Sequence, residues 1–189
     1  DTHEKKTAIV AVIDVPSQAY GRREEAYGIH LSLAAAANAY ADARSAGHPV
    51  VGLIVGMAMS GGFLAHGYQA SRLIALDDAR CMVHAMGKAS AARVTLRTVE
   101  QLEKLATLNP PIAYDIKSYQ SLGLLWRIIK VDNADAPGDH DMELVRTALS
   151  EALKDIAERG NDWLHRLHGE NRQATRTVRR LMQQAWSAE

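Results

Sequence analysis

A glycine-rich segment that follows an apolar run places the strongest constraint on how this chain folds. Val50–Val55 is short and β-branched, which predicts a buried strand. The segment that follows, Gly56–Gly67 (GMAMSGGFLAHG), has the small residues typical of a closely packed helix. Ser60, Gly61 and Gly62 are therefore expected where a strand ends and a helix begins. Such a helix start presents unpaired backbone N–H groups, and glycines let another backbone or a ligand approach them. The segment is expected to hold a phosphate, a carboxylate or an oxyanion.

Strand and helix patterns alternate over the first 132 residues, which predicts an α/β fold with right-handed crossovers. The run Thr7–Val15 is apolar at consecutive positions, as in a strand whose sheet is covered on both faces. The other expected strands are Arg72–Leu76, Cys81–Ala85 and Leu125–Val131. The expected helices are Glu24–Ser45, a short one that ends near Ala70, Lys88–Val94, Val99–Leu108 and Ile112–Ser121.

A polar segment with proline and glycine, Asn133–His140 (NADAPGDH), divides the chain by composition. We expect a core over residues 1–132 and a linker with a helical C-terminal extension over residues 133–189. Four arginines of the extension recur at the spacing of one helix face, which indicates either a solvated face or a docking stripe for an acidic partner. They are Arg172, Arg176, Arg179 and Arg180.

Composition excludes several classes of protein. Lysine and arginine total 22, aspartate and glutamate total 22, and this neutral balance argues against bulk nucleic-acid binding. Cys81 is the one cysteine, so no internal disulfide is expected and a reducing compartment fits. The eight histidines show no ligand spacing, so no metal site is expected. No apolar run reaches the roughly 18–20 residues that span a bilayer, and the first residues are polar, which together predict a soluble, cytoplasmic protein with no membrane partner.

Ser60 has two further interpretations. With His84 on a later strand it forms the pair that a serine hydrolase needs, and the two motifs resemble those of ClpP-type serine proteases. The surrounding Gly-Met-Ala-Met-Ser-Gly-Gly is not the Gly-x-Ser-x-Gly elbow of other hydrolases, however. Alternatively, Ser60 caps the helix that follows it. A second strand-to-helix turn, which contains Met86 and Gly87, repeats the arrangement and is expected to face the same pocket.

Three segments resemble one known family in the identity and order of their residues. Ile13–Glu25 (IDVPSQAYGRREE), Ser60–Gly67 (SGGFLAHG) and Val83–Lys88 (VHAMGK) look like the γ subunit of biotin-independent malonate decarboxylase. More distantly, they are similar to the C-terminal half of carboxyltransferase subunits. The resemblance implies a crotonase-like (ClpP/crotonase) α/β fold, a spiral of ββα units, followed here by the helical extension.

The resemblance also implies a function. The γ subunit of that family acts with a homologous β subunit to decarboxylate a malonyl thioester, which is carried on the prosthetic thiol of an acyl carrier protein. The implied partners are the β subunit, the acyl carrier protein subunit and the transferase α subunit, and neither biotin nor a directly bound cofactor is implied. A noncatalytic scaffold subunit, whose arginine stripe recruits a partner, is the remaining alternative.

The carboxyltransferase pattern assigns the site residues. It makes the backbone amides of Gly62 and Phe63 the donors to an oxyanion, with Gly61 allowing the turn. The residues expected to bind substrate are Ser60, His84, Tyr20, Met86 and Gly87. Two questions stay open from sequence. The amides could hold either the thioester oxygen or the malonyl carboxylate, and the proton that completes the reaction could come from His84, Tyr20, a water or the β subunit.

Overall fold

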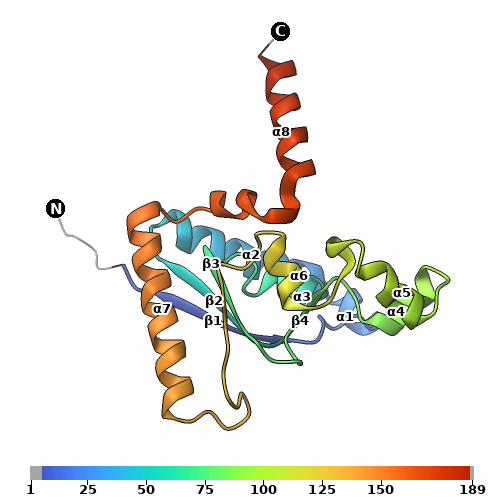
Figure 1. Cartoon of the computed structure of the whole chain (residues 1–189), viewed down its shortest axis with the longest axis horizontal. Coiled ribbons are helices and arrows are strands. Elements are labelled where there is room, and N and C mark those ends of the chain that lie inside the picture. The colour runs from blue at the N-terminus through green and yellow to red at the C-terminus, as the bar shows by residue number, and fades with distance from the viewer. Residues whose placement is uncertain (1–5, 188–189) are drawn as a thin grey trace.

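The sheet is built around β2 (Val50–Met59), the central strand of the computed structural model, which describes residues 6–187 (Figure 1). β2 pairs in parallel with β1 (Ile9–Val15) and with β3 (Arg72–Leu76), and β3 pairs in parallel with β5 (Arg127–Ile129). The short strand β4 (Met82–His84) pairs with the last three residues of β2. Because of this extra partner, β2 continues to Met59 and does not end at Val55 as predicted.

Residues 6–187 also contain eight α-helices and three 3₁₀ turns, and four of these elements follow the last strand. The prediction of one helix over Glu24–Ser45 is wrong, because Gly28 adopts φ +78° and separates two helices. The helix predicted over Ile112–Ser121 is shorter, since the side chain of Asp115 caps a helix that begins at Ile116. The helices are α1 (Arg22–Ala26), α2 (Ile29–Ser45), α3 (Ser60–Ala65), α4 (Lys88–Val94), α5 (Val99–Ala106), α6 (Ile116–Ser121), α7 (Asp139–Arg159) and α8 (Gln173–Trp186). The 3₁₀ turns are η1 (Pro110–Ile112), η2 (Leu164–His168) and η3 (Glu170–Arg172).

The two faces of the sheet are not covered equally. All five residues of β3 are buried, as expected for a strand with neighbours on both faces. On β1, Ala11 and Ile13 are buried, whereas Val10 is 41% and Val12 57% exposed. The prediction of a sheet covered on both faces is therefore wrong at this edge strand. The helix α2, which connects β1 to β2, likewise buries none of its residues.

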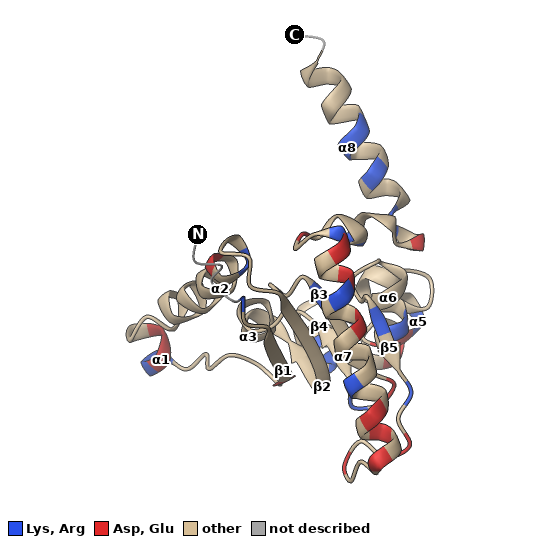
Figure 2. Ribbon diagram, turned by 90° about the vertical axis from the view of Figure 1, so that its left-hand side faces the viewer, with Lys and Arg blue, Asp and Glu red and all other residues tan. Residues whose placement is uncertain are grey.

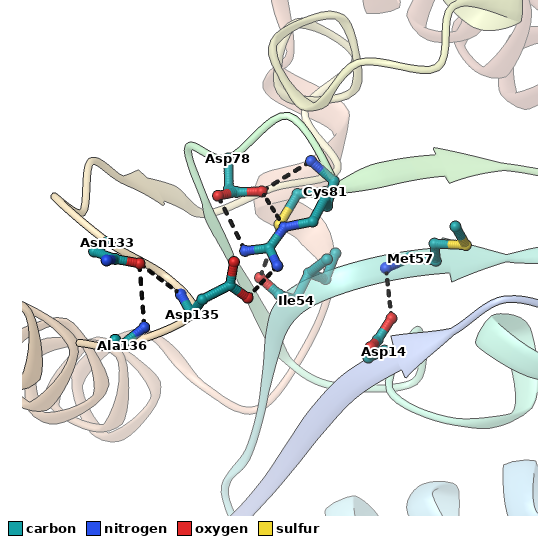
Figure 3. Close-up of polar contacts among 9 residues, drawn as sticks. Asp14, Ile54, Met57, Asp78, Cys81, Asn133, Asp135 and Ala136 are labelled. Atoms are coloured by element: carbon teal, nitrogen blue, oxygen red, sulfur yellow. Dashed lines mark hydrogen bonds and ion pairs between the residues drawn. The ribbon is translucent and has the colours of Figure 1, made fainter.

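A bulge in β2 precedes the turn at the end of that strand, because the step from Ile13 to Val15 on β1 is matched by the longer step from Ile54 to Ala58 on β2. The register of the two strands shifts between Ile13 and Val15, and the Asp14 carboxylate accepts the backbone N–H of Met57 at 2.9 Å (Figure 3). A side chain at Gly56 would lie 2.4 Å from an oxygen of Asp14, so only glycine fits there. The carboxylate thus fixes where β2 bends towards α3.

The C-terminal extension packs into the same core as the sheet. Ala148, Ala152 and Ile156 of α7 belong to the buried cluster that the strands form. The boundary predicted near residue 133 is therefore a change in composition, and the packing continues across it. Beyond α7, the Arg166 guanidinium donates to the backbone carbonyls of Tyr68 and Ala70, which ties η2 to the loop before β3.

The last helix, α8, projects away from the sheet (Figures 1 and 2). The four arginines expected to form a stripe on one helix face fall into two pairs with different surroundings. Arg172 donates to the carbonyl of Leu122, and Arg176 donates to the carbonyls of Leu167 and Gly169. These two arginines attach the extension to the body, so only Arg179 and Arg180 remain as a charged face on the exposed part of α8. None of the helices in the described residues is long and apolar enough to cross a membrane.

A half-buried histidine in η2, whose ring nitrogens are both buried, makes the stability of the extension sensitive to acid. Both ring nitrogens of His165 are buried and without a hydrogen-bond partner in the described part of the chain. Burial, and then the positive charges of Arg72 and Arg166, lower the pKa of His165 to about 4, against the opposing charges of Asp155 and Asp162. In the unfolded chain the ordinary pKa of about 6.5 applies.

Acid is therefore expected to destabilise the fold through His165. Because the folded pKa is the lower one, the unfolded chain binds the proton first, and stability falls as the pH drops from about 6.5 to about 4. Melting temperatures measured between pH 7.5 and 4.5 should fall less steeply for His165→Leu than for the unmodified chain. His168→Leu, at an exposed position in the same turn, is the control and should keep the original slope. Equal slopes for all three proteins would contradict this role.

Candidate functional site

The turn between β2 and α3 places a serine in an uncommon backbone conformation. Ser60 is the first residue of α3 and has φ +56°, a region that L-residues other than glycine, asparagine and aspartate rarely adopt. The N-cap position belongs to Met59, and no side chain caps this helix. The interpretation of Ser60 as the cap is therefore wrong. Its hydroxyl donates instead to Oε1 of Gln18, at 2.7 Å.

The same Gln18 oxygen accepts a second donor at the start of α3. The backbone N–H of Gly62 reaches Oε1 at 3.2 Å, so one amide oxygen receives both a hydroxyl and a backbone N–H. Gly62 is glycine because the loop after β1 lies against it. A Cβ there would be 2.7 Å from Cγ1 of Val15 and 3.0 Å from the backbone nitrogen of Gln18. The close approach that the sequence predicted at this glycine is made by the chain's own loop.

The helix register decides which amides are available at this turn. The N–H of Gly61 has no hydrogen-bond partner among residues 6–187, and Gly61 lines a cavity. Phe63 stands four residues after the N-cap Met59, where helix geometry directs its N–H to the Met59 carbonyl. Its ring is 2% exposed and packs edge-on against Tyr68, with 5.5 Å between ring centres. The geometry therefore gives the Phe63 ring a packing role, leaves the Gly61 N–H available at the cavity and directs the Gly62 N–H to Gln18.

A cavity of about 540 Å³ opens beside this turn. Its lining is largely apolar and comes from α3, β4, η1, α6 and the segment before α8. Such a concave, mostly apolar space with a few polar groups is typical of a small-molecule site. The lining residues used below are Ser60, Gly61, His84, Tyr119 and Arg172.

His84 lies at the end of β4, next to Met59 in the sheet, and is held by its own neighbours. Its ring stacks on Tyr114, with 3.8 Å between ring centres and an angle of 8°. Nδ1 lies 3.2 Å from the N–H of Met86 and 3.1 Å from its carbonyl, and Tyr114 Oη donates to that carbonyl at 2.8 Å. Burial lowers the pKa of His84, and the hydrogen bond to Met86 opposes this shift. The imidazole is therefore neutral at pH 7.

The residues predicted from sequence converge only in part. Ser60, Gly61, Phe63 and His84 line the cavity, but in the described residues Ser60 and His84 share no hydrogen bond. Tyr20 is 75% exposed and Met86 39% exposed, and neither is part of the lining. Gly87 is exposed as well. The second turn thus borders the site through Ala85 rather than through Met86 and Gly87.

Two residues at the site had no signal in the sequence. Gln18 stands within the segment Ile13–Glu25, but nothing in its spacing predicts a bond to α3. Tyr119 follows an ordinary helix pattern, and only folding brings it to the cavity. Across the described residues, no group of three or more histidine, cysteine or acidic side chains could hold a metal ion.

The fold is crotonase-like, as the resemblance implied, and is similar to that of a carboxyltransferase subunit. The chain superposes on the 12S subunit of transcarboxylase, a structure with hydrolysed methylmalonyl-coenzyme A bound, with a TM-score of 0.59. The identity is 21%, over 79% of this chain and 26% of that one, so this likeness concerns the fold alone.

Comparison with family models identifies a narrower family within this fold. The model of the malonate decarboxylase gamma subunit family matches residues 1–186, and the chain belongs to this family. It is 60% identical to a chain of a Pseudomonas malonate decarboxylase hetero-tetramer in complex with coenzyme A, with a TM-score of 0.93 over 98% of this chain and 70% of that one. A Pseudomonas malonate decarboxylase MdcD–MdcE hetero-dimer gives 56% identity and a TM-score of 0.89, over 98% and 69% of the two chains.

A further relative is named as a carboxyltransferase. The malonyl-S-ACP:biotin-protein carboxyltransferase MADD of Malonomonas rubra is 38% identical over 120 residues. The match covers 63% of this chain and 41% of MADD, so the chain spans about two fifths of that relative.

Proposed function

We propose that this chain acts with a homologous β subunit as a lyase that decarboxylates a malonyl thioester carried on an acyl carrier protein. The observation that carries the proposal is the oxygen site at the start of α3. There, the side-chain amide oxygen of Gln18 (Oε1) accepts hydrogen bonds from both the Ser60 hydroxyl and the Gly62 backbone amide. A thioester oxygen is an acceptor of the same kind and could replace it. Family membership and the coenzyme A bound in the Pseudomonas hetero-tetramer support a thioester as the ligand.

For decarboxylation, this turn needs to supply little more than hydrogen-bond donors to an oxygen. When the bond between the α-carbon and the carboxylate breaks, its electron pair moves to the α-carbon and the thioester oxygen, and CO₂ leaves. The amides of Gly61 and Gly62 would hold the negative oxygen of this enolate. One such donor is worth about 2.7–4 kcal/mol, or 10²–10³ in rate. We propose the thioester oxygen rather than the malonyl carboxylate as the group held by these amides, because the thioester oxygen gains charge in the transition state whereas the carboxylate loses it.

The enolate then takes a proton at its α-carbon and becomes an acetyl thioester. His84 is a poor source, because burial keeps its pKa below the ordinary value and the imidazole is neutral at pH 7. Tyr20 is 75% exposed and lies outside the cavity lining. We infer that the donor is a water or a group of the β subunit.

A partner subunit is supported by surfaces that the described chain leaves open. Val10 and Val12 expose one face of the edge strand, and α2 buries none of its 17 residues. The MdcD–MdcE hetero-dimer shows that a relative assembles with a second subunit. We infer that the β subunit and the acyl carrier protein are the partners, and that biotin takes no part in the reaction.

The test is to mix the purified chain with the β subunit and malonyl-S-pantetheine and to measure CO₂ and acetyl thioester. The pair should release both in equal amounts, whereas each subunit alone should release neither. Addition of avidin should not change the rate, because no biotin is needed. A folded pair that forms no acetyl thioester would contradict the proposal.

Ser60→Ala separates this reaction from serine hydrolysis. The substitution removes one hydrogen bond to Gln18, whose net worth is about 0.5–1.5 kcal/mol, so CO₂ release should fall by less than about tenfold. Loss of a true nucleophile would lower the rate by about 10⁶. The unmodified chain should also resist labelling by a fluorophosphonate. Labelling at Ser60 with loss of activity in the variant would favour the hydrolase alternative.

A further inference from the structure

Arg172 contributes a cation to the cavity that the reaction proposed above does not use. Its Nε donates to the carbonyl of Leu122 at 2.8 Å, which fixes the plane of the guanidinium. Within the described residues, the two terminal nitrogens of this group have no hydrogen-bond or ion-pair partner. Arg172 is half-buried and lines the cavity. The planar edge that a guanidinium offers to a carboxylate or phosphate is therefore unused.

Tyr119 supplies a second donor to the same cavity. The residue belongs to α6 and lines the same cavity, and its hydroxyl has no hydrogen-bond partner in residues 6–187. Burial raises the pKa of Tyr119, while the positive charges of Arg166 and Arg172 oppose this shift. The phenol therefore stays protonated at neutral pH and can donate to an anion.

The rest of the lining offers these donors no counter-charge. No aspartate or glutamate lines the cavity, and the neighbours of Arg172 along its wall include Leu122 and Leu124. A half-buried cation in mostly apolar surroundings is costly unless an anion meets it. Both terminal nitrogens of Arg172 and the Tyr119 hydroxyl are thus suited to one oxyanion group.

We propose that Arg172 and Tyr119 form an anion subsite of the cavity, which binds the phosphate of the prosthetic arm that carries the thioester. The proposal rests on the proposed function, because that function supplies the carrier. A carboxylate of the malonyl group has the same chemistry, but a cation beside it would stabilise the charge that must leave during decarboxylation. A spectator phosphate suffers no such conflict.

The test compares two substrates with the assembled γ–β complex, malonyl-S-phosphopantetheine and malonyl-S-pantetheine. Arg172→Gln should raise KM for the phosphorylated substrate by about tenfold to a hundredfold, the usual worth of a hydrogen bond to a charged group, with kcat unchanged. The KM for the substrate without phosphate should stay as it is. Tyr119→Phe should act in the same direction by a smaller factor, and it leaves the bond from Arg172 to Leu122 intact. Arg179→Gln, at an exposed position on α8, is the matched control and should change neither KM.

Binding measurements separate the sources of the anion and do not depend on turnover. Calorimetric titration of the complex with inorganic phosphate and with malonate should show phosphate binding that Arg172→Gln abolishes. If that variant instead loses malonate binding and weakens both substrates equally, the anion is the malonyl carboxylate, and the phosphate assignment is overturned. If neither anion binds, or if Arg172→Gln and Arg179→Gln behave alike, there is no anion subsite. Phosphate binding without CO₂ release would contradict the proposed function and leave the subsite standing.

Discussion

Gly62→Ala is expected to lower CO₂ release by the assembled complex at least 10²-fold, the usual cost of one lost oxyanion donor. The new Cβ would lie 2.7 Å from Cγ1 of Val15 and 3.0 Å from the backbone nitrogen of Gln18. Because the second neighbour is backbone, α3 or the loop after β1 must move, and the amides of the turn move with it. Such overpacking typically also costs about 1–3 kcal/mol of stability.

Two further alanines separate these effects. At Gly61 the nearest atom to a new Cβ is Oε1 of Gln18, at 3.3 Å, which is the end of a flexible side chain. Gly61→Ala should therefore keep its stability and lose less activity than Gly62→Ala. Gly138→Ala, where no atom lies within 4 Å, should leave the rate unchanged. The measurements are CO₂ release at saturating substrate and urea unfolding of each variant. Full activity in a folded Gly62→Ala variant would rule out this turn as the oxyanion site.

Arg72→Met is expected to lower the free energy of unfolding by about 3–5 kcal/mol, the usual cost of removing one partner from a buried ion pair. Arg72 begins β3 and is 2% exposed. Its Nε donates to the Asp155 carboxylate of α7 at 2.6 Å. Its terminal nitrogens donate to the carbonyls of Ser71, Gly160 and Asp162. The variant would leave Asp155 with only its exposed partner Arg159, and it would remove the Arg72 donor from these three carbonyls where β3 meets the C-terminal extension.

The same carboxylate provides the control. Arg159 pairs with Asp155 at 3.1 Å, but its side chain is 78% exposed. Arg159→Met should therefore cost at most about 1 kcal/mol. The double variant Arg72→Met with Asp155→Leu should recover part of the loss, because the half-buried Asp155 carboxylate is removed together with its buried partner. Urea unfolding of the four proteins measures these differences. Equal losses in Arg72→Met and Arg159→Met would show that burial of the pair carries no weight.

Much of the fold could be predicted because it depends on local patterns. The strand Arg72–Leu76 and the helix Lys88–Val94 have the predicted bounds, since an apolar run and a small-residue helix are each visible within a few residues. The predictions are wrong where contacts with a distant segment determine the structure. The sequence showed no reason for β2 to continue to Met59, because its partner β4 lies more than 20 residues further along the chain. It showed no reason for β1 to expose Val12, because a continuous apolar run does not say which of its faces is covered.

The candidate site, like the fold, could be predicted from the sequence only in part. From the sequence came the strand-to-helix turn with its two glycines, the family, and the expectation of an oxygen held by backbone amides. Those features follow from residue type and order alone. Tertiary structure decided that Gln18 places an oxygen on the Gly62 amide, that Ser60 bonds to Gln18 rather than to His84, and that the Phe63 ring packs on Tyr68. It also brought Tyr119 and Arg172 to one cavity. The bonds of Gln18 to Ser60 and Gly62, and of Arg172 to Leu122, join residues more than 40 positions apart, and no local pattern encodes them because they depend on how the whole chain closes around β2.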